Sequence, residues 1–180
     1  ANLTFTKPSS GEKPGYIQNH QTGEIIAKGI DWISLSADED SLMVYSQKGK
    51  RGYINRYSGE ISIPAQYDKA WVFAEGVAAV AEKDSVYFIN HAGLPINGKK
   101  FRYNAKNRGY VYHGGHCAIA VDGGMMGLID LDGDWAVRPD YDWIVSECNN
   151  FWKMRKGGSQ TGLWYAFNEK AEQVTETGYP

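Results

Sequence analysis

Short apolar stretches, separated by polar turns, run along most of the chain. Residues 53–54 are apolar, the polar stretch NRYSGE follows, and residues 61–63 are then apolar, polar and apolar in turn. An alternation of period two is typical of a half-buried strand, and a glycine-containing polar stretch between two such segments predicts a hairpin. Residues 52–63 are therefore expected to fold as two antiparallel strands.

The residues that follow predict two more strands. Pro64 prevents the hydrogen-bonded ladder from continuing as a central strand, and a new segment is expected to begin at Tyr67-Asp68. The stretches AWVF (70–73) and VAAV (77–80) are rich in strand-forming residues and are joined through Gly76. No window of 11 residues shows an apolar period of 3.6, so we expect four short strands and little helix.

The same order of residues returns along the chain at intervals of 35 to 40 residues. It begins at five places: Gly15-Tyr16-Ile17, Gly52-Tyr53-Ile54, Tyr87-Phe88-Ile89, Gly127-Leu128-Ile129 and Gly162-Leu163-Trp164. Asp31, Asp68 and Asp142 repeat in phase with these starts. A fixed period of this length is typical of stacked or radially arranged units. The sequence therefore predicts an all-β fold of about five antiparallel β-meander units.

Two segments resemble a known family. GYINRYSGEISIPAQYDKAWVFAEGVAAV (52–80) and GLIDLDGDWAVRPDYDWI (127–144) are similar to WG-type β repeats of bacterial proteins, the WG containing repeat family. The third unit lacks the Pro-x-Tyr-Asp segment, and the fifth ends after its first hairpin. The resemblance implies an exported, all-β interaction scaffold, and it brings no catalytic residues.

Two arrangements accommodate five such units in a single β-repeat domain spanning residues 1–180. One is a closed, propeller-like array and the other is an open β-solenoid. The strand-like segment NLTFT (2–6) precedes the first unit, and the last unit is incomplete. Pairing between them would hide two sheet edges, so closure is expected.

Composition narrows the function classes. The chain has 180 residues, 42% of them apolar, and a net charge of −2, which argues against nucleic acid as a partner. No apolar stretch is long enough for a membrane span. The chain starts at Ala1, which suits a periplasmic or secreted protein after removal of a signal peptide and suits a trimmed cytoplasmic protein equally well. Cys117 and Cys148 could form one disulfide in an oxidising compartment.

Two stretches imitate catalytic or metal sites. In HGGHC, His113, His116 and Cys117 offer ligand chemistry, but the glycines indicate a turn and Cys117 aligns with the core residue Ala78. DLDGD (130–134) opens like a calcium loop but lacks that loop's later glycine and glutamate, so a hairpin turn explains it. We expect no metal, no cofactor and no enzymatic activity.

The insertion at residues 97–116 departs from the repeat and is the candidate binding surface. It is basic, aromatic and free of acidic residues. Tyrosine and arginine are common at the centres of interfaces, and cations steer an acidic partner. The predicted binding residues are Lys99, Lys100, Phe101, Arg102, Tyr103, Arg108, Tyr110 and Tyr112. The alternative is a degenerate strand pair with solvated lysines.

These features favour a non-enzymatic protein-binding scaffold. Its most concrete form is an inhibitor or immunity protein that blocks a toxin or enzyme, with a partner that presents an acidic cleft. A glycan-binding module of the cell envelope is the alternative, and Trp32, Trp71 and Trp143 would serve either inter-unit packing or a sugar platform. A hydrolase is the least favoured class.

Overall fold

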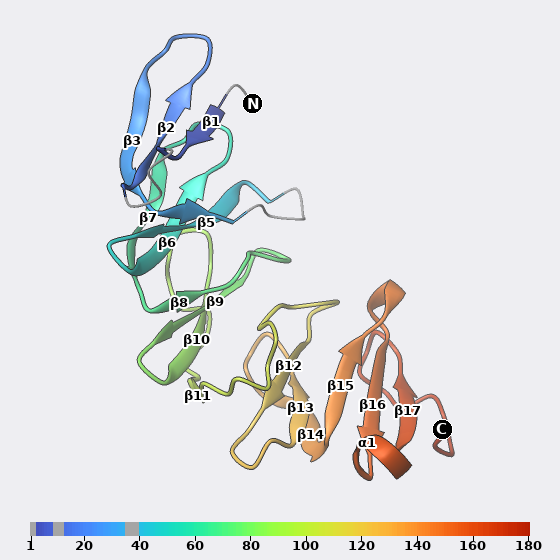
Figure 1. Ribbon diagram of the computed structural model, residues 1–180. Helices are drawn as coiled ribbons and strands as arrows, with labels where there is room; N and C mark the ends of the chain where they lie inside the picture. Colours follow the sequence, from blue (N-terminus) through green and yellow to red (C-terminus); the bar gives the residue numbers. More distant parts are fainter. Residues whose placement is uncertain (1–2, 9–12, 35–39) are drawn as a thin grey trace. The chain divides into compact units, whose positions relative to one another are not determined.

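The chain consists almost entirely of short antiparallel strands (Figure 1). The computed structural model describes residues 3–8, 13–34 and 40–180. Within these ranges the strands form five small sheets, and the helical elements are α1 (Gly158–Thr161) and the 3-10 turn η1 (Cys148–Asn150). No helix in this described part is long and apolar enough to cross a membrane. The predicted all-β fold with little helix is confirmed.

The chain divides into two compact units. The first comprises residues up to 84 together with 88–95, and the second comprises 85–87 together with 96–180. In the first unit, one sheet has the order β1 (Leu3–Thr6), β2 (Gly15–Asn19), β3 (Ile25–Ile30). The next has the order β4 (Trp32–Ile33), β5 (Leu42–Gln47), β6 (Lys50–Asn55), β7 (Ile61–Tyr67). β8 (Lys69–Ala70) then pairs with β9 (Ala78–Glu82).

The boundary between the units runs through β10 (Ser85–Ile89). In the second unit, the first residues of β10 pair with β11 (Phe101–Arg102). One sheet follows with the order β12 (Cys117–Ala120), β13 (Met126–Ile129), β14 (Trp135–Tyr141). The last sheet has the order β15 (Trp143–Ser146), β16 (Trp152–Lys156), β17 (Leu163–Phe167).

The sequence repeat is out of phase with the sheets. The sequence repeat that starts at Gly52 supplies β6 and β7 to one sheet and then β8 and β9 to the next. The sequence repeat that starts at Gly127 is divided in the same way, between the sheet of β13 and β14 and the sheet of β15 and β16. Each repeat therefore links two consecutive sheets through its own chain.

The glycine that opens the repeat is required by a bulge in the neighbouring strand. Pairing jumps from Tyr53 with Ile63 to Arg51 with Tyr67, so three residues that begin with Pro64 lie opposite Gly52. A Cβ on Gly52 would lie 2.4 Å from the Ile63 carbonyl oxygen. The bulge is in an edge strand, where a proline leaves no ladder hydrogen bond unmade.

The second unit repeats this device with Pro139 in the edge strand β14. A Cβ on Gly127 would lie 2.3 Å from the Val137 carbonyl oxygen and 2.8 Å from the Pro139 nitrogen. Gly52 and Pro64 are separated by the same number of residues as Gly127 and Pro139. The glycine that starts the repeat and the later proline therefore belong to one backbone contact.

Two details of the predicted strands are wrong. β7 continues through Pro64 as far as Tyr67, so the new segment begins at Lys69 rather than at Tyr67-Asp68. The AWVF stretch contributes only Ala70 to β8, because Phe73 turns into the core, fully buried, instead of continuing the ladder.

An Asx turn closes the first hairpin of each of the five sequence repeats. A side-chain oxygen at the end of the first strand, or directly after it, accepts hydrogen bonds from backbone N–H groups two to four residues later. The residues that supply it are Asn19, Asn55, Asn90, Asp130 and Asn168. Asp130 accepts from Asp132 at 3.0 Å and from Asp134 at 3.0 Å. The predicted hairpin turn in DLDGD is confirmed, and the Asp130 carboxylate is used by the backbone.

Two of the repeated aspartates, Asp68 and Asp142, have structural roles. Asp68 accepts from the backbone N–H of Lys83 at 2.6 Å and pairs with Lys50. Asp142 accepts from the backbone N–H of Gly158 at 2.9 Å and from Arg155 Nε at 2.6 Å. Asp68 therefore fixes the turn between β9 and β10, and Asp142 fixes the start of the connection between β16 and β17.

Acid is expected to remove the contribution of Asp142. Desolvation acts to raise the pKa of this carboxyl, but the hydrogen bonds from Gly158 and Arg155 outweigh it and hold the pKa below its ordinary value. A lowered pKa gives stability that is present above the unfolded pKa of about 3.9 and is lost as the pH falls through the folded pKa. Asp142→Asn should lower the free energy of unfolding by about 1 kcal/mol at neutral pH and by much less near pH 3. Urea unfolding of both proteins at the two pH values measures this, and an equal difference at both would contradict it.

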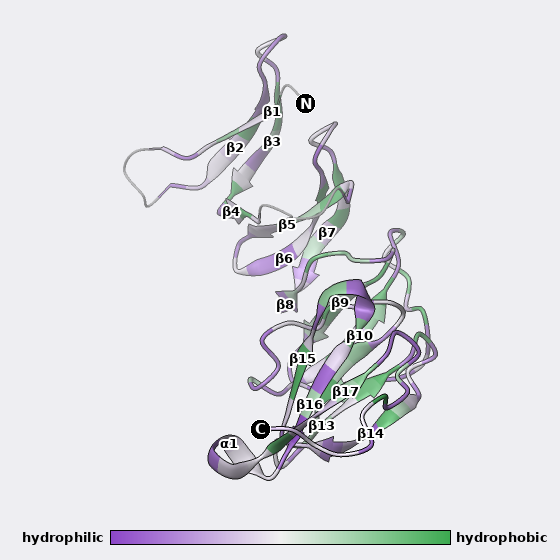
Figure 2. Cartoon of the chain, turned by 90° about the vertical axis from the view of Figure 1, so that its right-hand side faces the viewer, coloured by the Kyte–Doolittle hydropathy of each residue, from purple (hydrophilic) through white to green (hydrophobic). Residues whose placement is uncertain are grey.

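Hydrophobic clusters hold neighbouring sheets together within each unit. In the first unit, Ile17 and Ile30 pack with Tyr45 and Ile54 of the next sheet. In the second unit, the cluster joins both sheets and consists of Ala120, Met126, Leu128, Tyr141, Ile144, Trp152, Met154 and Phe167. Figure 2 shows that hydrophobic residues also run along β9. β1 forms the edge of the first sheet by pairing with β2, and its pairing with the last unit stays a prediction, as does closure of the array.

Candidate functional site

The basic residues at the start of the insertion are paired with carboxylates from other turns. Lys99 Nζ lies 2.7 Å from Asp134, and Arg102 lies 3.3 Å from Asp122. Lys100 Nζ lies 5.4 Å from the centre of the Tyr87 ring. The insertion has no acidic residue of its own, but folding brings two carboxylates to it. Exposed pairs of this kind contribute little stability, and they lower the net positive charge offered to a partner.

The aromatic residues of the insertion divide between partly buried and fully buried positions. Phe101 and Tyr103 are partly buried, and the Phe101 ring meets Trp135 edge to face at 6.2 Å. Tyr110 and Tyr112 are only 1% and 2% exposed. Their predicted place on a binding surface is therefore wrong, because rings buried in the sheet packing cannot present a face to a partner.

The two buried tyrosines instead fix the loop between β11 and β12. The Tyr112 hydroxyl donates to the Asp130 carbonyl oxygen at 2.9 Å. The Tyr110 hydroxyl accepts from the backbone N–H of Asn104 at 2.9 Å. Burial raises the pKa of both phenols, so they stay neutral and serve as hydrogen-bonding groups.

Asn107 anchors the middle of the same loop. It is 6% exposed, donates through Nδ2 to the Ala118 carbonyl oxygen at 2.9 Å and accepts at Oδ1 from the Ala120 N–H at 2.7 Å. Both of its hydrogen-bonding groups are thus used on β12. Its neighbours Lys106 and Arg108 lie over Trp143, and Lys106 Nζ also donates to the Gly124 carbonyl oxygen.

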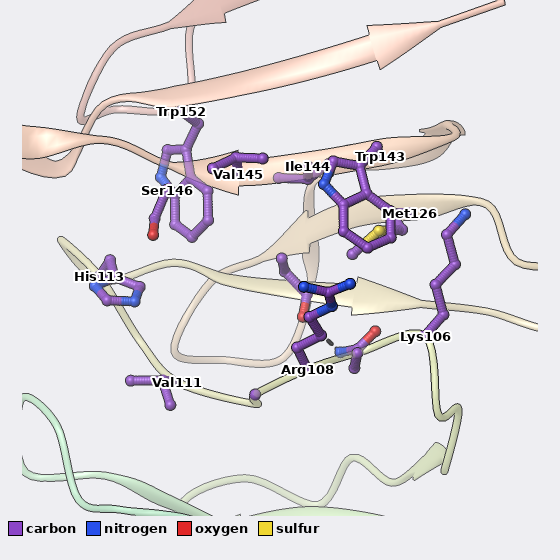
Figure 3. A pocket seen from close by; sticks show the side chains of 13 residues that line it. Lys106, Arg108, Val111, His113, Met126, Trp143, Ile144, Val145, Ser146 and Trp152 are labelled. Atoms are coloured by element: carbon purple, nitrogen blue, oxygen red, sulfur yellow. Dashed lines mark hydrogen bonds between the residues drawn. The ribbon is translucent and has the colours of Figure 1, made fainter. Parts of the chain in front are cut away.

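Lys106 and Arg108 line a pocket between this loop and β15 (Figure 3). Lys106 Nζ lies 5.7 Å and the Arg108 guanidinium carbon 5.6 Å from the centre of the Trp143 ring. The cavity has a volume of about 500 Å³, and His113, Ser146 and Trp152 form its other end. None of its lining residues is acidic. The structure therefore places two cations over an aromatic face, where cation–π attraction holds them.

Sequence reasoning found only part of this pocket. Arg108 was predicted as a binding residue, but Lys106, His113, Trp143 and Trp152 were not. Trp143 was noted for its repeated position, and it does pack against the core cluster of the second unit while its face meets the two cations. The sequence does contain one signal for the pocket, the order Lys-Asn-Arg at residues 106–108. In it the buried amide of Asn107 separates two cationic side chains that are not buried.

The HGGHC stretch is the tight turn that was predicted. His113 and His116 exchange backbone hydrogen bonds of 2.8 and 3.2 Å across Gly114 and Gly115, both at positive φ. Cys117 begins β12, is fully buried and has its pKa raised by desolvation, so its thiol is held protonated. Both cysteines are free thiols. The His113 ring meets Trp152 edge to face at 5.8 Å, which makes it a wall of the pocket.

The family model of the WG containing repeat matches residues 52–87 and 126–157. These two segments are WG repeats. Each covers two strands of one sheet and two of the next, so the WG repeat is the linking element that the strand pairing shows. The resemblance drawn from the sequence is confirmed for both segments.

Solved β-propeller structures share the fold of the chain. Hsv2 of Kluyveromyces marxianus matches with a TM-score of 0.53 at 10% identity, over 96% of this chain and 56% of that one. BamB of Moraxella catarrhalis matches with a TM-score of 0.51 at 10% identity, over 97% of this chain and 66% of that one. This chain thus spans just over half to two thirds of the length of those structures. At such identity the likeness shows the fold alone, and no curated protein matches the sequence.

Proposed function

We propose that this WG-repeat chain is a non-enzymatic protein-binding scaffold, and that its concrete form is an inhibitor or immunity protein that binds and blocks a toxin or enzyme. The observation that carries the proposal is the loop at residues 104–112. Hydrogen bonds made by the side chains of Asn104, Asn107, Tyr110 and Tyr112 fix it. Lys106, which is also bonded to the Gly124 carbonyl oxygen, and Arg108 line an open pocket. A loop fixed before binding loses little entropy when a partner arrives.

The charge of the pocket indicates the kind of partner. Within the described part of the chain, Lys106 and Arg108 form no ion pair, whereas Lys99 and Arg102 do. Lys106 Nζ also donates to the Gly124 carbonyl oxygen, and its charge helps to lower the pKa of Asp142, so the proposal rests chiefly on Arg108. A cation beside an aromatic ring favours a partner with an acidic cleft or protrusion. The binding surface proposed is therefore the pocket, and the paired basic residues at 99–102 lie outside it.

Affinity capture tests the proposal with matched charge changes. The chain, immobilised as bait, should retain one protein at a stoichiometry near one to one from bacterial extracts. The double variant Lys106→Glu and Arg108→Glu should lose that protein, because it reverses both charges of the pocket. The control Arg138→Glu and Lys170→Glu makes the same change in charge at exposed positions outside the pocket and should retain it. Retention on peptidoglycan without any protein would support the glycan-binding alternative, and equal capture by both double variants would contradict the proposed surface.

A further inference from the structure

The polar groups that line the pocket are nearly all hydrogen-bond donors. Lys106 and Arg108 can only donate, and so can the indole N–H of Trp152. Ser146 adds a hydroxyl. The one amide among the lining residues, Asn107, has both its donor and its acceptor engaged on β12. A ligand that fills this pocket must therefore supply acceptors.

One of these donors has no partner. Trp152 is 2% exposed, and its Nε1 forms no hydrogen bond within the described part of the chain. A buried N–H without an acceptor costs about 1 to 3 kcal/mol. Trp152 lies at the end of the pocket opposite Lys106 (Figure 3), and its N–H is itself buried within this wall.

The apolar walls set the size and shape of the ligand. Met126, Ile144 and Val145 line the cavity together with the face of Trp143. A volume of about 500 Å³ holds one or two side chains and excludes a folded element. An acceptor group on a short apolar stem fits these walls.

We propose that the pocket binds one carboxylate of the partner, on a glutamate or aspartate side chain next to an apolar residue. Arg108 supplies the paired N–H donors, since a guanidinium held against an aromatic ring keeps its edge for a carboxylate. Lys106 adds a second positive charge. This inference rests on the proposed function and names the group that the pocket takes. Neutral sugars are a poorer fit, because their hydroxyls can accept hydrogen bonds but carry no negative charge to pair with Arg108 and Lys106.

Short peptides test the carboxylate directly. The full chain is titrated with acetyl-Ala-Glu-Leu-Ala-amide and with the same peptide carrying Gln in place of Glu, while the indole N–H signals of Trp143 and Trp152 are followed by NMR. The Glu peptide should shift both signals and bind at least about tenfold more tightly than the Gln peptide, because a charge-assisted pair is stronger than a neutral one. Arg108→Gln should weaken the Glu peptide at least about tenfold, Arg108→Lys less, and the control Arg138→Gln not at all.

Four results would overturn the carboxylate inference: no shift with the Glu peptide, equal affinity for both peptides, no effect of Arg108→Gln, or tighter binding of inorganic phosphate than of the Glu peptide. If the peptide fails while protein capture still depends on Lys106 and Arg108, the carboxylate inference is wrong and the protein-binding proposal stands. If the peptide binds through Arg108 while no protein is captured, the carboxylate inference stands for a small acid and the protein-binding proposal is wrong.

Discussion

Replacing Gly127 by alanine is expected to lower the free energy of unfolding by about 3 kcal/mol or more, as overpacking against immobile atoms does. The added Cβ would lie 2.3 Å from the Val137 carbonyl oxygen, and the atoms it meets are backbone. A flexible side chain could move aside, but the bulge around Pro139 can move only by breaking its pairing with β13. Gly52→Ala should have the same effect in the first unit, where the Ile63 carbonyl oxygen is equally close.

Gly98→Ala is the matched control for this prediction. Gly98 has nothing within 4 Å of an added Cβ and does not lie at positive φ. Its change should leave stability within about 0.5 kcal/mol of the wild type. Urea unfolding of the three variants and the wild type measures the differences. A loss at Gly127 no larger than that at Gly98 would refute the glycine and proline contact as the basis of the repeat.

Tyr112→Ala is expected to lower the free energy of unfolding by about 4 kcal/mol, in the range for large buried aromatic residues. The ring is 2% exposed, and its hydroxyl holds the Asp130 carbonyl oxygen. Tyr112→Phe keeps the ring and removes one hydrogen bond, so about 1 kcal/mol should be lost. Thermal and urea unfolding both report these changes.

Tyr57→Ala is the control for an exposed tyrosine, since this ring is 57% exposed in the turn after β6. It should change stability by about 0.5 kcal/mol or less. If Tyr112→Ala instead leaves stability unchanged and weakens capture of the partner, the ring belongs to the binding surface and its assignment to the core is wrong.

The hairpins and their order could be predicted because they depend on local signals. Asn55 and Asp130 each end a strand and cap their own turn, so the turn can be read from a few adjacent residues. The repeat of Gly-aromatic-Ile with a later proline also lies in the sequence. The physical reason for this repeat cannot be read from the sequence, because the contact of Gly127 with the bulge at Pro139 is made across two strands.

The binding surface could be predicted only in part because charge and burial at the insertion depend on distant residues. Lys99 and Arg102 meet Asp134 and Asp122, which come from later turns. Tyrosine is a residue type that is common at interfaces, and only the packing of the sheets shows that Tyr112 is buried. Arg108 stays a predicted binding residue, and its neighbour Trp143 lies 35 positions further along the chain, so their contact cannot be read from adjacent residues.

The rate of association with the captured partner tests the central claim most directly. Rates should be measured at about 50 mM and about 500 mM NaCl, which span strong and weak screening of charge. If Lys106 and Arg108 form the binding surface, wild-type association should slow at least about tenfold at the higher salt concentration, and the Lys106→Glu, Arg108→Glu variant should be slow at low salt and lose this dependence. Wild-type association that does not change with salt, or a double variant that associates as fast as the wild type, would contradict a binding surface at this pocket.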